Sequence, residues 1–145
     1  MNRAKRLQPV QNLMDDNERK LARSVAAFEK RLHDAELKLA ELERYQGEYQ
    51  RQLAERAGQG IGVMGLRDYQ AFLARLVEAI RQQRAVVQRA VSERDVERKK
   101  WQLAAQRARA IDHVVDQWQA EERRAEDRRE QIEIDERAQR VRTER

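Results

Sequence analysis

A seam of apolar residues occurs twice along this chain, once on each side of a glycine-rich segment. Each seam advances in alternating steps of four and three residues, so its members return to one face of an α-helix. The first seam consists of Leu21, Val25, Phe28, Leu32, Ala35, Leu39, Leu42, Gln46, Tyr49 and Leu53. The second consists of Tyr69, Leu73, Leu76, Ile80, Gln83, Val87, Ala90, Arg94, Glu97, Trp101, Ala104, Ala108, Ile111, Val115 and Trp118. The glycines between them are Gly58, Gly60, Gly62 and Gly65. Two seams joined by a flexible turn predict two helices folded back on each other.

The expected fold class is therefore all-α, a long antiparallel coiled-coil hairpin of two helices. We expect the first helix over about 7–57, a glycine-rich turn over 58–65 and the second helix from about 66. Pro9 falls in the first turn of the first helix, where a missing N–H costs least, and no other proline interrupts the chain. The hairpin would form a domain over 1–118.

The seams also predict which residues lie opposite each other. Folding the chain about a centre near Ile61 pairs positions whose numbers sum to about 122, so that Tyr49 lies level with Leu73. By this rule the pairing ends at Trp118. More than half of the residues in 119–145 are charged, and the hairpin has no face left to bury them. We expect this stretch to be a charged helical extension that frays or is ordered by a partner.

Some seam positions are polar. They are Gln46, Gln83, Arg94 and Glu97, with Glu18 extending the register toward the N-terminus. Polar residues in a seam commonly fix its register at some cost in stability. A second interpretation, in which this middle region bends or twists during function, stays open.

Composition excludes several classes of protein. Of the 145 residues 39% are charged and only 5% aromatic, too little apolar bulk for a globular core of that size. The chain has no cysteine, hence no disulfide framework or thiolate metal site. No apolar run approaches the roughly 18 residues of a membrane span, and none follows the basic start as in a signal peptide. We expect a soluble cytoplasmic protein that does not insert into the membrane.

The net charge of +5 comes from interspersed signs rather than from a basic arm. In 81–109, where arginines and lysines are in surplus, the acids Glu93, Asp95 and Glu97 lie among them. Such mixing is typical of solvated helix faces, so we expect no nucleic-acid partner. Nucleic-acid binding is the last-ranked alternative, and it would show a steep salt dependence.

No residues point to catalysis. His33 and His113 fall at different levels of the hairpin and have no second histidine at ligand spacing. The glycines of 58–62 superficially resemble a dinucleotide loop, but no predicted strand precedes them. A two-helix hairpin also has no cleft to shift a pKa for acid–base chemistry. We expect no enzyme activity, no cofactor and no metal.

A few apolar residues lie one position from the seams, near the turn. Tyr45, Phe72 and Ala79 fall at nearly one level by the pairing rule. With the seam residues Leu42, Tyr49 and Leu76 they would form a patch that continues onto one flank. An exposed aromatic patch indicates a partner site, whereas a slightly wider core near the turn would need no partner. Periodicity leaves both interpretations open.

These residues also carry a resemblance. The combination comprises Leu42, Tyr45 and Tyr49, the segment 68–80 with its Tyr-Gln-Ala-Phe-Leu run, Trp101, and Gln131, Asp135, Glu136 and Ala138 in the tail. In this combination the sequence resembles, over essentially its whole length, the FliJ family of bacterial flagellar protein export. Whether the chain is more closely related to the corresponding stalk of virulence secretion systems stays open.

The resemblance implies a non-enzymatic coiled coil similar to the central stalk of rotary ATPases. Such a stalk inserts its terminal end into the hexamer of the export ATPase and promotes hexamer assembly, while its hairpin end reaches the membrane-embedded export gate. The family also binds export chaperones. For this chain it implies a role in flagellum biogenesis and motility, and a cytoplasmic protein peripherally associated with the inner membrane.

The resemblance also implies two sets of site residues. The gate-binding set is Leu42, Tyr45, Tyr49, Phe72, Leu76 and Ala79, bordered by Lys38 and Gln83. The ATPase-binding set is Leu13, Met14, Arg19 and Lys20, together with the charged tail. We expect the isolated protein to be a monomer. The alternative is a structural coiled-coil rod that self-associates and has no role in export.

Overall fold

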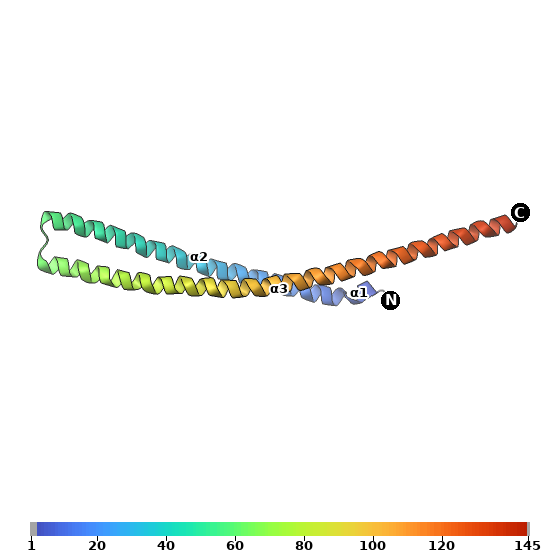
Figure 1. Cartoon of the computed structure of the whole chain (residues 1–145), viewed down its shortest axis with the longest axis horizontal. Coiled ribbons are helices and arrows are strands. Elements are labelled where there is room, and N and C mark those ends of the chain that lie inside the picture. Colours follow the sequence, from blue (N-terminus) through green and yellow to red (C-terminus); the bar gives the residue numbers. More distant parts are fainter. Residues whose placement is uncertain (1–2, 145) are drawn as a thin grey trace. The chain divides into compact units, whose positions relative to one another are not determined.

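A computed structural model describes residues 3–144, which form three helices in chain order. These are α1 (Arg3–Arg6), α2 (Gln8–Gln59) and α3 (Val63–Thr143). The two long helices α2 and α3 run antiparallel and pack against each other (Figure 1). The predicted all-α, two-helix hairpin is therefore confirmed.

The short helix α1 is separated from α2 by one residue, Leu7. The Leu7 N–H is shared between the carbonyls of Arg3 (3.3 Å) and Ala4 (3.2 Å), and the regular helical bonding resumes with Gln11 donating to the Leu7 carbonyl at 2.8 Å. Pro9 explains the interruption, because its ring excludes the helical hydrogen bond to the residue four positions earlier.

The connection between α2 and α3 comprises Gly60, Ile61 and Gly62, and is shorter than the expected 58–65. Gly60 has φ of 87°, the left-handed conformation that commonly ends a helix, and its N–H donates to the Ala57 carbonyl at 3.4 Å. Gly65 lies inside α3, where a Cβ would approach the Ile61 side chain to 2.9 Å. The outer glycines therefore belong to the helices, so the glycine-rich segment is longer than the turn itself.

Replacing Gly60 by alanine is expected to lower the free energy of unfolding by about 1 kcal/mol, because an L side chain is strained at positive φ. Gly58→Ala is the matched control. Gly58 lies in the last turn of α2 with open space around it, so alanine there should favour the helix. Urea unfolding followed by circular dichroism measures both effects. Equal destabilisation by the two variants would contradict the role of Gly60.

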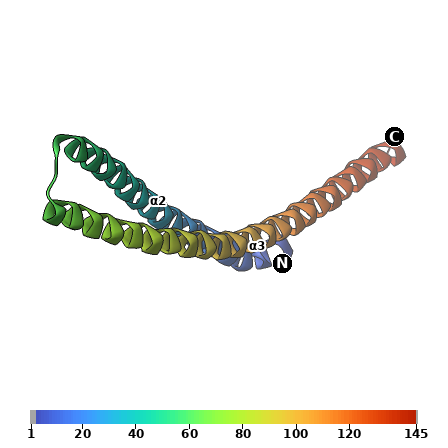
Figure 2. The same cartoon turned by 60° about the vertical axis from the view of Figure 1, so that its left-hand side comes forward.

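The chain divides into two compact units. The hairpin unit comprises Leu21–Lys100, which is the turn with the adjoining parts of α2 and α3. Its two helices stay side by side in both views (Figures 1 and 2). The terminal unit comprises 3–20 and 101–144 among the described residues.

The contacts within each unit follow the predicted pairing. In the hairpin unit the side-chain partners include Ser24 with Glu97 and Tyr49 with Phe72. In the terminal unit, Gln11 donates to Asp112 at 2.7 Å. The residue numbers of each pair sum to about 122, as a coiled-coil hairpin requires.

The core of each unit is the predicted seam. The buried apolar residues of the hairpin unit are Leu32, Ala35, Leu76, Ile80 and Ala90. Those of the terminal unit are Ala4, Ala104, Ala108 and Val115. Each one lies in the predicted register, and Ala4 continues it toward the N-terminus. Alanine is frequent here because a small side chain lets two helices approach closely.

Within the terminal unit the pairing continues slightly past Trp118. Arg3 forms an ion pair with Glu121 at 2.9 Å, and its guanidinium carbon lies 4.8 Å from the centre of the Trp118 ring. α3 then continues to Thr143, and each described residue after Ala125 is exposed. Fraying of this extension, or its ordering by a partner, stays a prediction.

Candidate interaction surfaces

Three aromatic rings pack together in the hairpin unit, close to the turn. The rings of Tyr49 and Phe72 are stacked, with centroids 4.2 Å apart and planes inclined by 28°. The ring of Tyr69 lies 5.9 Å from Tyr49 at an angle of 57°. All three residues are partly exposed. These separations are those at which aromatic pairs attract each other beyond the burial of their surface.

The sequence positions of the rings explain why they meet. Tyr49 and Tyr69 occupy seam positions on opposite helices, and Phe72 lies one position before the seam residue Leu73. Tyr45 lies one helical turn before Tyr49 on α2 and is 42% exposed. We call Tyr45, Tyr49, Tyr69 and Phe72 the aromatic face. A hollow beside it is lined by Tyr49, Asp68, Tyr69, Phe72 and Arg75.

The predicted gate-binding residues differ in how much surface they offer. Lys38 is exposed, and Leu42 and Ala79 are half-buried. Leu76 and Gln83, in contrast, are only 7% exposed. A partner in the observed conformation would therefore meet the aromatic face and its neighbours, while Leu76 and Gln83 support that surface from the core.

Gln83 is the buried polar residue of the described core. Its side-chain Nε2 donates to the backbone carbonyl of Ala35 on α2, at 2.9 Å. A buried amide that lacked a partner would cost stability, so this bond favours the register in which Gln83 reaches Ala35. Its role in the structure is to join the two helices.

Tyr69 is the residue of this surface that the predicted site set does not contain. Its seam position was evident, but the pairing rule placed Leu73 rather than Tyr69 level with Tyr49. The pairing rule considers only residues directly opposite each other. Tyr49 and Tyr69 are offset along the two helices, and their long side chains still bring the rings into contact.

Two further polar seam positions of the hairpin unit, Glu97 and Arg94, are also bonded. Glu97 accepts hydrogen bonds from the Lys100 ammonium and the Ser24 hydroxyl, each at 2.9 Å. The bond from Lys100 first, and that from Ser24 second, hold the pKa of the Glu97 carboxyl below its ordinary value. Arg94 instead turns to its neighbour Asp95 at 2.9 Å. The charged side chains of Glu97 and Arg94 therefore both have hydrogen-bonding partners within the hairpin unit.

The terminal unit holds the predicted ATPase-binding residues. Leu13 is 65% exposed although it is a large apolar residue, and Arg19 and Lys20 are exposed as well. Met14 is half-buried. Further along the unit, Trp101 donates its ring N–H to Glu18 at 2.8 Å. Leu13 and the two cations are thus each accessible on α2, whereas Met14 is partly covered.

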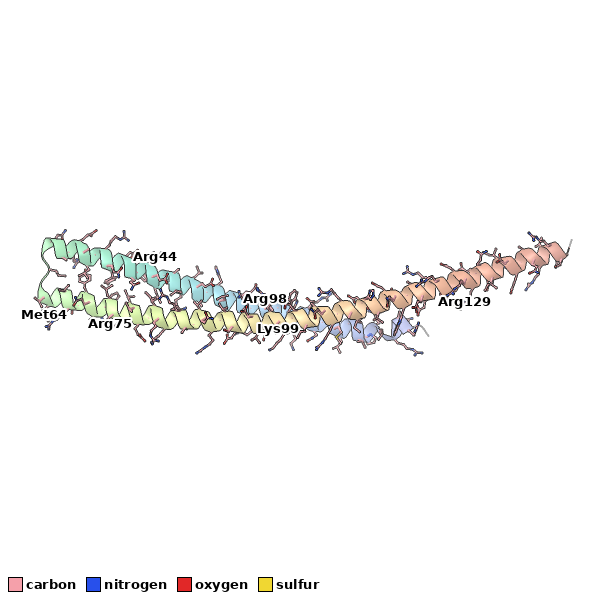
Figure 3. All side chains as sticks on the ribbon, viewed as in Figure 1. Arg44, Met64, Arg75, Arg98, Lys99 and Arg129 are labelled. Carbon is pink, nitrogen blue, oxygen red and sulfur yellow. The ribbon has the colours of Figure 1, made fainter. Side chains whose placement is uncertain are left out.

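Other apolar side chains are exposed as well. At the turn, Val63 is 70% and Met64 71% exposed, and Figure 3 shows Met64 at the start of α3. In the extension, the exposed apolar residues are Ile132, Ile134 and Val141.

The described residues carry no cluster of three or more potential metal-binding side chains. His33 and His113 are both exposed. In the described part of the chain, no helix is long and apolar enough to cross a bilayer.

Comparison with known proteins identifies the family to which the chain belongs. No curated protein and no solved structure matches the chain significantly. The family model described as flagellar FliJ protein matches residues 3–144, nearly the whole of the 145-residue chain. The helical hairpin agrees with the fold that the resemblance implied. The chain therefore belongs to the flagellar FliJ family, a family of non-catalytic components of flagellar export.

Proposed function

We propose that this protein is a stalk and adaptor of the flagellar type III export apparatus. It promotes assembly of the export ATPase hexamer, contacts the cytoplasmic part of the membrane-embedded export gate, and handles export chaperones. It works in the cytoplasm, peripherally associated with the inner membrane, and is a monomer when isolated. The membership of nearly the whole chain in the FliJ family is the observation that carries this proposal.

The two units support a division of labour. The hairpin unit offers a localised aromatic face, which suits a specific contact with the export gate. The terminal unit offers an exposed helix with mixed charges, and its ion pair between Arg3 and Glu121 is exposed on both sides. Exposed ion pairs contribute only about 0 to 1 kcal/mol each, so such a surface can slide between ATPase subunits without adhering to one.

The ATPase contact is tested by titrating this protein into the cognate export ATPase at a concentration where the hexamer is scarce. We expect ATP hydrolysis to rise severalfold, because binding to the hexamer shifts the assembly equilibrium toward it. A variant with Leu13→Ala and Arg19→Ala should raise hydrolysis less. Unchanged hydrolysis, with no co-elution of the two proteins, would contradict the proposed ATPase contact.

One observation favours a second candidate function. Ile132, Ile134 and Val141 are each more than half exposed, so the extension offers apolar side chains to a second copy. In that case the protein would be a structural, self-associating coiled coil without a role in export. Light scattering separates the two candidates. A monomer near 17.2 kDa supports the adaptor, and a stable dimer or tetramer supports self-association.

A further inference from the structure

Three of the four rings of the aromatic face each lie beside an arginine. Measured from guanidinium carbon to ring centre, the pairs are Arg44 with Tyr45 at 5.8 Å, Arg56 with Tyr69 at 5.6 Å and Arg75 with Phe72 at 5.8 Å. A guanidinium at this distance is attracted by the negative face of the ring. Figure 3 labels Arg44 on α2 and Arg75 on α3, so both helices contribute to this arrangement.

The three arginines have no carboxylate partner among residues 3–144. Other arginines of the same unit do have one, since Arg84 pairs with Glu43 at 3.3 Å and Arg98 with Glu29 at 2.8 Å. Acids also lie at the aromatic face, but they form no ion pair with these three arginines. Glu41 accepts the Tyr45 hydroxyl at 3.5 Å, and Asp68 lines the hollow beside Phe72 without pairing with Arg75.

The chemistry of this arrangement favours a carboxylate ligand. All three arginines are exposed, so their N–H groups remain open to an incoming partner. A guanidinium is more weakly hydrated than an ammonium, and its planar fork matches a carboxylate in two parallel hydrogen bonds. Contact with a ring limits the orientations of each arginine, so less freedom is lost when a partner binds.

We propose that the aromatic face binds an acidic protein surface, with an apolar centre against the rings and carboxylates around it that pair with Arg44, Arg56 and Arg75. The proposal refines the proposed contact with the export gate, and it rests on that contact only for the identity of the partner.

A nucleic acid fits this surface less well than an acidic protein does. Bases bind aromatic side chains by stacking on ring faces, and here Tyr49 and Phe72 stack on each other while arginines lie over Tyr69 and Phe72. An apolar side chain has no such need, because it can pack against any exposed part of these partly exposed rings.

The experiment uses the full chain and two synthetic peptides of equal length. Both have a Leu-Trp centre, flanked by Asp and Glu in one peptide and by Lys in the other. Titrations are followed by the NMR signals of the tyrosine and phenylalanine rings. We expect saturable shifts at the rings of the aromatic face, with the acidic peptide binding at least about tenfold more tightly than the basic one.

Replacing Arg44, Arg56 and Arg75 by glutamine should abolish that preference while the apolar contact remains. The matched control replaces Arg23, Arg51 and Arg89 by glutamine. These are likewise exposed arginines of the hairpin unit that have neither a ring contact nor an ion pair among the described residues. The control has the same net charge, so it should lose only the small, general part of the preference. Circular dichroism checks that both variants keep their helices.

The outcomes separate this inference from the proposed function. Equal binding of both peptides, binding of neither, or loss of the preference in both triple variants would overturn the inference. So would a short single-stranded oligonucleotide that binds the same rings as tightly as the acidic peptide. If the acidic peptide is preferred but the export gate does not bind, the inference stands and the gate contact fails.

Discussion

Replacing Ile80 by alanine is expected to lower the free energy of unfolding of this protein by about 3 kcal/mol. Ile80 is only 3% exposed, and it is one of the few large side chains that the seam buries so fully. Removing its methyl and methylene groups costs their transfer from water plus the cavity left behind, which together amount to about 2–5 kcal/mol in well-packed cores. A two-helix seam has no third layer whose movement would fill that cavity.

Val77→Ala is the control for this prediction. Val77 lies three residues before Ile80 on α3 but is 54% exposed, so its loss should cost less than about 0.5 kcal/mol. Urea unfolding followed by far-UV circular dichroism measures both variants. A similar, small loss for Ile80→Ala and Val77→Ala would mean that the seam is not the source of stability in the hairpin unit.

The second large effect is expected on binding. Phe72→Ala should weaken binding to the cytoplasmic part of the export gate by about thirtyfold or more, as is typical of an aromatic residue at the centre of an interface. The substitution removes the ring of Phe72, and it also removes the stacking partner that orients Tyr49 at 4.2 Å. Isothermal titration of the gate fragment with wild-type and variant protein measures the change. The effect on helicity should be small, because Phe72 is partly exposed.

Phe28→Ala provides a matched control. Phe28 is also a half-buried ring of the hairpin unit, and its centre lies 4.7 Å from the guanidinium carbon of Arg31. It lies far along the helices from the turn, outside the aromatic face. Both variants should lose similar stability, while only Phe72→Ala loses affinity for the gate. Equal loss of affinity in both would indicate that binding depends on the general stability of the hairpin and not on the aromatic face.

The fold was largely predictable because a coiled coil depends on local periodicity. Steps of four and three residues placed Leu32, Leu76 and Ile80 on inward faces, and the structure buries all three. The glycine-rich segment correctly located the turn, but the predicted turn of 58–65 is longer than the observed connection. Gly60 ends α2 by its positive φ, whereas Gly58 and Gly65 adopt helical conformations like any other residue.

The candidate site was less predictable. Tyr45, Tyr49 and Phe72 were evident from their positions near the turn, but two interpretations of them remained, a partner site and a wider core. In the structure the rings pack together and remain partly exposed, so the partner site stays a prediction. The contact of Tyr69 with Tyr49 was missed because it depends on the direction of two side chains rather than on spacing.

The sequence by itself determined the helices, the seam that joins them and the family, because each is encoded in residue type and spacing along one chain. The tertiary structure decided which polar and aromatic groups meet across the seam. Gln83 bonds to the Ala35 carbonyl in the core, while Arg56 reaches the ring of Tyr69 on the opposite helix and remains without a carboxylate partner among the described residues. Such contacts depend on side-chain rotamers and on the fine register of two helices. A one-dimensional pattern leaves both of these undetermined.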